Sequence, residues 1–211
     1  MSIVDRAKNI ILKPADEWQV IAGEPATVNG LFTGYAMILA AIPVAAAIIF
    51  TGALGLSAAG LGGMGGGVMA MGFGAIAGMA VIGYILSLIT LYIMSMIVNA
   101  VSPSFNGKSD IVQSAKLMTY ASTPTWVAGL LSWIPLVGGL IALAAIAYVV
   151  YLIYLGLKPV LGVPQEKVAG FTVVIVLIYI VLSIVVSGII VGLLFTTFFG
   201  NAMMGGVMSG A

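Results

Sequence analysis

The sequence contains no cysteine and no histidine. Without cysteine the chain forms no disulfide and has no thiolate for a metal site. Without histidine it lacks the commonest general base and metal ligand, which excludes a serine–histidine intramembrane protease and a zinc protease with an H-E-x-x-H motif. These absences predict a protein that is not an enzyme and has no cofactor.

Charge is scarce as well. Seven Lys and Arg and six Asp and Glu make up 6% of 211 residues, whereas soluble proteins have roughly 25%. The net charge of +1 provides no basic face for a nucleic acid, and the predicted spans contain no carboxylate for an aspartyl protease. Residues 1–24 are polar and charged, so no cleavable signal peptide is predicted. With 62% hydrophobic residues, the chain is expected to be an integral membrane protein.

The charged residues form three clusters: Asp5 to Glu24, Lys108 to Lys116, and Lys158 to Lys167. A bilayer core excludes charge, and a helix needs about 20 apolar residues to cross it. The uncharged stretches therefore predict an all-α polytopic membrane protein with five transmembrane helices, at about 31–54, 75–99, 117–133, 140–157 and 171–199. We expect an N-terminal arm (1–30), a membrane domain (31–199) and a Gly/Met-rich tail (200–211).

Proline and glycine predict the irregularities. Pro43 predicts a kink in the first span, and the glycine-rich stretch 55–74 predicts a flexible connection. Pro124 interrupts the third span, a tight reversal is expected at 135–139, and a polar loop at 158–170. The third and fourth spans are near the lower length limit for crossing. A re-entrant hairpin, which turns back inside the membrane, is therefore the alternative.

The N-terminal arm predicts two short helices. Residues 2–12 have apolar residues at helical spacing, which favours an amphipathic helix on the membrane surface. Pro14 followed by acidic residues predicts a second helix start, with Trp18 at the headgroup level. The alternative is a solvated arm. With five spans all seven Lys and Arg lie on one side, so the positive-inside rule predicts a cytoplasmic N-terminus and an outside C-terminus.

Three segments carry a family resemblance. They are 11–24 (ILKPADEWQVIAGE), 120–124 (YASTP) with 131–135 (LSWIP), and 148–157 (YVVYLIYLGL). In this order they resemble the Yip1 domain family of five-span membrane proteins, in particular its prokaryotic members. The resemblance implies an integral protein of a prokaryotic cytoplasmic membrane. Eukaryotic members are associated with Rab GTPases and vesicle traffic. This chain has a short arm and lacks their DLYGP-type stretch, so that partnership is not carried over.

The leading hypothesis is a scaffold or adaptor that organises the membrane or docks a cytoplasmic or membrane protein. Its candidate binding residues are Pro14, Trp18, Glu24, Tyr120 and Pro124. The alternative is a channel or transporter for a small neutral solute along the Pro124 region. A weaker alternative is Cu(I) capture by the outer methionines, namely Met64, Met69, Met71, Met203, Met204 and Met208.

Small residues at spacing four predict close helix packing. They are Gly74, Gly78, Ser183, Ser187, Gly188 and Gly192. We expect contact within one subunit, with a homo-oligomer seam as the alternative. In either case the bilayer is the main partner.

Overall fold

The computed structural model describes residues 1–58, 72–131, 134 and 136–195, with side chains described for 1–50, 77–131, 134 and 136–193. Regular structure in these residues is helical throughout, as the sequence predicts. The long elements are α4 (Met37–Ala58), α6 (Gly72–Val101), α9 (Val137–Leu161) and α10 (Gln165–Phe195). The short ones are α1 (Ile3–Leu12), α2 (Pro14–Gly23), α3 (Val28–Leu31), α7 (Ile111–Ala121) and α8 (Thr123–Ala128), with η1 (Phe32–Ala36), η2 (Ser102–Phe105) and η3 (Gly129–Leu131).

Four stretches are long and apolar enough to cross a membrane. They are Val28–Phe50, Ala77–Phe105, Val137–Leu161 and Gln165–Leu193. The predicted third span is not among them, because the chain from 111 to 131 is divided into α7, α8 and η3. The break falls at Ser122, just before Pro124, which is the second residue of α8. Proline suits this position, because the N–H it lacks would have no partner in the first turn of a helix.

The polar loop predicted at 158–170 is wrong in its extent. Helix α9 continues through Lys158 and Pro159 to Leu161, and α10 begins at Gln165. The helix ends at Gly162, whose φ of +68° is a conformation that glycine adopts without a steric penalty. The turn is therefore much shorter than the charged and proline-containing sequence indicates.

Two other predicted connections also change. The reversal expected at 135–139 is centred on Leu136, which has a φ of +63°, while Gly138 and Gly139 lie in the first turn of α9. Helix α4 runs through Pro43 to Ala58 and α6 begins at Gly72, so helices take up both ends of the predicted connection 55–74. All six methionines of the Cu(I) hypothesis fall outside the described residues.

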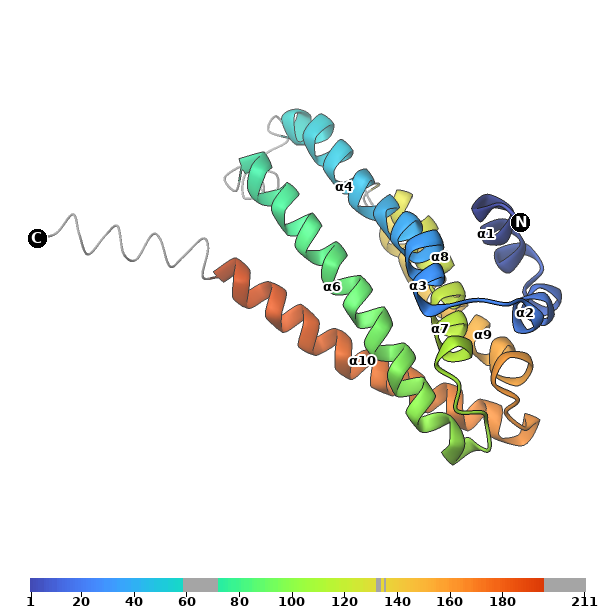
Figure 1. The fold of residues 1–211 in the computed structure, drawn as a ribbon. Helices are drawn as coiled ribbons and strands as arrows, with labels where there is room; N and C mark the ends of the chain where they lie inside the picture. The colour runs from blue at the N-terminus through green and yellow to red at the C-terminus, as the bar shows by residue number, and fades with distance from the viewer. Residues whose placement is uncertain (59–71, 132–133, 135, 196–211) are drawn as a thin grey trace, which may run out of the picture.

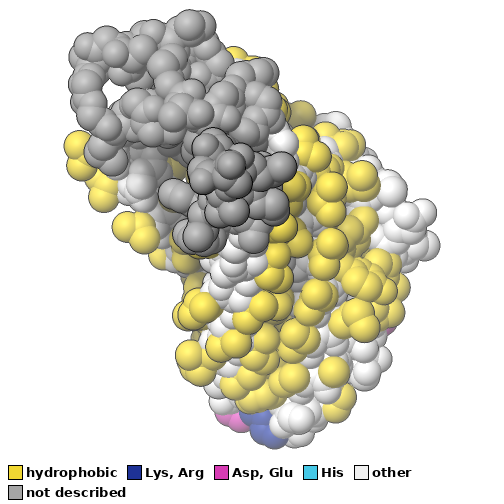
Figure 2. Space-filling view, turned by 90° about the vertical axis from the view of Figure 1, so that its left-hand side faces the viewer, with side chains coloured by type: hydrophobic (Ala, Val, Ile, Leu, Met, Phe, Trp, Pro, Cys, Tyr) yellow, Lys and Arg dark blue, Asp and Glu magenta, His cyan; other side chains and the backbone are white. Residues whose placement is uncertain are grey.

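The packed core lies at one end of the bundle. On α6 the buried hydrophobic residues are Leu91, Met94 and Val98, near its C-terminus; on α10 they are Val168, Phe171 and Ile175, near its N-terminus. At the opposite end α4, α6 and α10 extend beyond α8 (Figure 1). Figure 2 shows a face with mainly apolar side chains along the described helices and its most prominent charged side chains at the lower end. The chain thus combines a compact, charged end with an apolar end suited to lipid.

Candidate functional site

Helices α1 and α2 are part of the packed core. The side chains of Ile10, Trp18 and Ile21 are fully buried and belong to the same hydrophobic cluster as residues of α6, α7 and α9. Trp18 packs against α9 at Gly156: a Cβ placed on Gly156 would lie 2.8 Å from the Trp18 ring and 2.5 Å from Leu117 Cδ1 of α7. The ring of Trp18 therefore packs inside the protein and contacts neither lipid nor solvent, and its predicted headgroup level stays a prediction.

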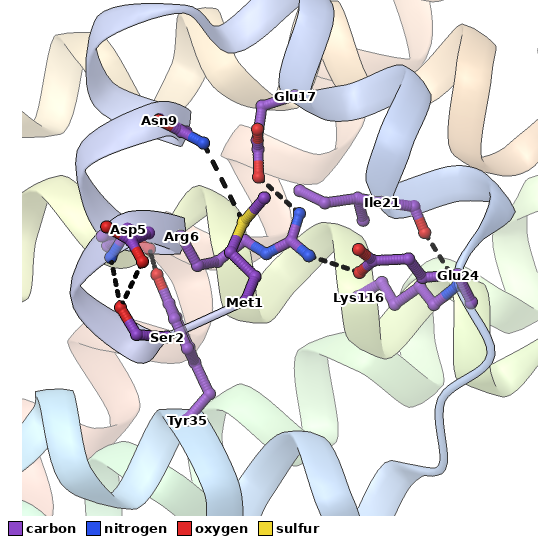
Figure 3. Close-up of polar contacts among 11 residues, drawn as sticks. Met1, Ser2, Asp5, Arg6, Asn9, Glu17, Ile21, Glu24, Tyr35 and Lys116 are labelled. Carbon is purple, nitrogen blue, oxygen red and sulfur yellow. Dashed lines mark hydrogen bonds and ion pairs between the residues drawn. The ribbon is translucent and has the colours of Figure 1, made fainter.

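Four charged residues hold α1, α2 and α7 together (Figure 3). Two ion pairs of Arg6 join α1 to the glutamates of the same arm, and Lys116 joins the arm to the bundle. The Arg6 guanidinium donates to Glu17 at 2.5 Å and also to Glu24. Arg6 and Glu17 are 6% and 5% exposed, whereas the Glu24 side chain is 40% exposed. Lys116 of α7, 2% exposed, lies on the other side of Glu24. We call Arg6, Glu17, Glu24 and Lys116 the ionic cluster; their formal charges sum to zero.

The bundle also caps both N-terminal helices. The last carbonyls of a helix lack partners within the helix and carry partial negative charge. Lys116 Nζ donates to the carbonyls of Ile21 at 2.9 Å and Glu24 at 2.5 Å, at the C-terminus of α2. Tyr148 of α9 donates to the carbonyl of Ile11 at 2.7 Å, at the C-terminus of α1. Both helix ends therefore depend on side chains far away in the sequence.

Burial and charge act on the two cations in different ways. Desolvation lowers the pKa of Lys116 below its ordinary value, and the charges of Glu24 and Asp110 oppose this only in part. Desolvation also lowers the pKa of Arg6, but its hydrogen bond to Glu24 and the charges of both glutamates outweigh that effect. The pKa of Arg6 therefore lies above its ordinary value. The cluster holds Arg6 as a cation and makes the charge on Lys116 costly.

Aromatic side chains connect the ionic cluster to the helix break. The Arg6 guanidinium lies 5.5 Å from the Tyr120 ring centroid, within cation–π range. Tyr120 meets Tyr35 edge to face at 4.8 Å, and the Tyr35 hydroxyl lies 2.9 Å from Thr123 Oγ1. Thr123 and Pro124 are buried at the start of α8. Side chains of the N-terminal arm and of η1 therefore support the break between α7 and α8.

The five predicted binding residues have different positions. Trp18, Glu24 and Tyr120 lie in or beside the ionic cluster, and Pro124 lies just beyond it. Pro14 begins α2, as the sequence predicts. The sequence interpretation missed Arg6, Glu17, Lys116 and Tyr35. A signal was present for Arg6, because it shares a helix face with Ile3 and Ile10 and so interrupts an apolar stripe with a charge.

Three of the predicted small-residue positions have open space where a side chain would begin. A Cβ placed on Gly78, Gly188 or Gly192 would have no atom within 4 Å. Ser183 and Ser187 line a cavity, and the surroundings of Gly74 lie outside the described side chains. Packing within one subunit therefore stays a prediction.

Comparison with known proteins identifies one family. The model of the Yip1 domain matches residues 8–188, which include the ionic cluster except Arg6, together with the helix break and all the long helices except the far end of α10. No curated protein and no solved structure matches the chain. Because the match covers most of the sequence, the chain belongs to the Yip1 domain family.

Proposed function

We propose that this protein is a non-enzymatic membrane scaffold, whose docked N-terminal helices form a fixed platform for a cytoplasmic protein. The observation that carries the proposal is the attachment of α1 and α2 through the ionic cluster and both helix caps. An arm held in this way presents a constant surface instead of a changing one. The Yip1 domain family is not a known enzyme family, which agrees with the absence of histidine and cysteine.

The outer face of this platform has both charged and apolar side chains. Lys8, Lys13, Asp16 and Gln19 are exposed. Val4, Leu12 and Val20 are also exposed, at 75%, 65% and 44%. Apolar residues among charges of both signs are typical of a surface that binds a protein, because the apolar residues supply burial and the charges supply selectivity.

A photo-crosslinking amino acid at Gln19 tests this proposal in native membranes. We expect a discrete protein adduct from Gln19, and loss of it when Arg6→Met releases α1. The matched control is the same amino acid at Lys167, a partly exposed position in the first turn of α10. No adduct, or the same adduct from Lys167, would count against a platform on α1 and α2.

We further propose that α4, α6 and α10 cross the membrane while the hairpin of α8, η3 and α9 enters it only in part. The charged guanidinium of Arg6 on α1 lies near the level of Tyr35, because Arg6 contacts Tyr120 and Tyr120 contacts Tyr35. The 22 residues of α4 beyond this level have a length of about 33 Å, close to the ~30 Å of a hydrocarbon core. The 6 residues of α8 and 3 of η3 add only about 15 Å.

This placement keeps the orientation predicted from charge. All seven Lys and Arg lie toward the compact end, so the positive-inside rule makes that end cytoplasmic, in a prokaryotic cytoplasmic membrane. The N-terminus is then inside and the C-terminus outside. Both the five-span arrangement and a partly inserted hairpin give this result, because each brings the chain back to the same side before α10.

Labelling of single cysteines separates the two arrangements, since the natural chain has no cysteine to interfere. Leu136 is 87% exposed at the hairpin reversal. We expect a membrane-impermeant maleimide added outside the cell to leave Leu136→Cys unlabelled. Ser109→Cys, in the exposed segment before α7, should react only in inverted vesicles. Rapid labelling of Leu136→Cys from outside would instead establish full crossing.

A further inference from the structure

A cavity of about 280 Å³ lies between α6, the break from α7 to α8, and α10. A second cavity of about 250 Å³ lies on the α9 side and shares the wall residues Met118, Ser122, Thr125, Tyr179 and Ser183. Each is slightly smaller than the roughly 300–1,000 Å³ that ligand pockets occupy, so only a small molecule or group fits. Both lie where the helix is broken, at the level of the uncharged part of the bundle.

Hydroxyl groups line the larger cavity. Ser87 and Thr90 come from α6, Ser122 and Thr125 from the break, and Tyr179, Ser183 and Ser187 from α10. No Lys, Arg, Asp or Glu is among its lining residues. A concentration of uncharged polar groups at this depth needs a reason, because polar side chains in a membrane segment usually face a partner or a water-filled space. The lining favours a neutral, polar occupant.

Most of these hydroxyls have already used their hydrogen. Ser122 Oγ lies 2.8 Å from the Met118 carbonyl, and Thr125 Oγ1 lies 2.7 Å from the Ser122 carbonyl. Thr90 Oγ1 lies 2.7 Å from the Leu86 carbonyl. A carbonyl oxygen only accepts, so in each contact the hydroxyl must donate.

The same holds for two more hydroxyls of the lining. Ser87 Oγ lies 2.7 Å from the carbonyl of Tyr84, and Ser183 Oγ lies 2.8 Å from the carbonyl of Ile180. A hydroxyl that donates still has lone pairs with which to accept. The cavity wall therefore presents several acceptors and few donors, and a complementary molecule must bring donors of its own.

We propose that this cavity binds an uncharged group with several hydroxyl donors, that is, a small polyol or the glycerol group of a neutral lipid. The absence of charge in the lining disfavours phosphates, carboxylates and amines, whose charge would be desolvated without a partner. The excess of acceptors disfavours ethers and esters, which cannot donate. The site is distinct from the ionic cluster and does not depend on a cytoplasmic partner.

The test measures binding to the full-length protein in nanodiscs, by the shift in thermal unfolding that each probe causes. Glycerol represents a free polyol, and a monoacylglycerol added to the nanodisc represents a lipid source. Glycerol 3-phosphate carries charge, and 1,2-dimethoxyethane has a similar size but only accepts. We expect binding of glycerol, of the monoacylglycerol or of both, and at least about tenfold weaker binding of the other two.

Thr90→Val and Thr125→Val remove an acceptor from the wall while they keep the shape of the side chain. The matched control is Thr172→Val on α10, a buried threonine outside the cavity whose hydroxyl donates to the Val168 carbonyl at 2.9 Å. We expect each cavity variant to weaken binding of the active probe by about tenfold, and the control to leave it unchanged.

The binding results distinguish a free polyol from a lipid and also test whether the cavity binds either. Binding of glycerol alone assigns a free polyol, and binding of the monoacylglycerol alone assigns a lipid. No binding of either probe overturns the proposal. Equal binding of 1,2-dimethoxyethane, or equal losses in Thr125→Val and Thr172→Val, overturns it as well.

Discussion

Arg6 is the residue whose replacement tests the docking of the N-terminal arm most directly. Arg6→Met keeps an unbranched apolar stem but removes the guanidinium and with it the charge opposite Glu17, which is 5% exposed. Breaking a buried ion pair on one side costs about 3–5 kcal/mol, because the remaining charge is left without a partner. The pair with Glu24 adds little, roughly 0–1 kcal/mol, because that carboxylate is partly in solvent.

The expected size follows from this difference. Since 1.4 kcal/mol is a factor of ten in an equilibrium constant, the undocked population of α1 should rise by roughly two to three and a half powers of ten. Amide hydrogen exchange of residues 6–12 in nanodiscs measures that population, because the backbone of α1 is protected while the helix is docked. Labelling of Ala7→Cys, at a site that is 8% exposed, is an independent measure.

Two variants make the result decisive. Lys8→Met removes an exposed charge from the same helix and should change exchange by less than threefold. Arg6→Met with Glu17→Met removes both partners and should recover most of the lost protection, because no unpaired charge stays buried. If Arg6→Met behaves like Lys8→Met, or if the double variant is as loose as Arg6→Met, the ion pairs of Arg6 do not hold α1 in place.

Three further outcomes follow from the packing and from the buried lysine. Gly156→Ala should lower the free energy of unfolding by about 1–3 kcal/mol, measured by thermal unfolding in detergent, because the new Cβ would lie 2.5 Å from Leu117 Cδ1 and 2.8 Å from the Trp18 ring. The control Gly139→Ala lies on the same helix with no atom within 4 Å of its Cβ, so it should not lower the free energy of unfolding. Gly129→Ala should loosen the hairpin from α4 at a similar cost, because its Cβ would lie 2.6 Å from Pro43 Cγ and 2.7 Å from Pro43 Cβ. An unchanged melting temperature of Gly129→Ala in the same assay would contradict this contact. The natural protein should become more stable relative to Lys116→Met as the pH rises from the lowered pKa of Lys116 to its ordinary value of 10.5. In that window the unfolded chain binds a proton that the folded chain has released. A stability difference that does not depend on pH would show that the lysine is not desolvated.

The sequence by itself determined that this protein is helical, that it has stretches apolar enough for a membrane, and to which family it belongs. The separation of charge into three clusters predicts helices long enough for a bilayer, and the chain has four such stretches in its described part. The order of its motifs predicts the Yip1 domain, which the family comparison confirms. Pro14 correctly predicts the start of α2, because the constraint acts within one turn of the helix. These properties depend on local composition and spacing, which a sequence displays directly.

Only the tertiary structure decided where the N-terminal arm lies and how its charges are satisfied. Arg6 and Glu17 are on different helices, and Lys116 is more than ninety residues from the carbonyls that it caps. No periodicity encodes such partners, because they depend on how separate helices pack. The position of Trp18 shows the same limit: its amphipathic ring suits a membrane surface, but the space left by Gly156 lets it pack inside the bundle. Local composition and spacing determine where helices form, and the complementary shapes and charges of segments far apart in the sequence determine how these helices pack.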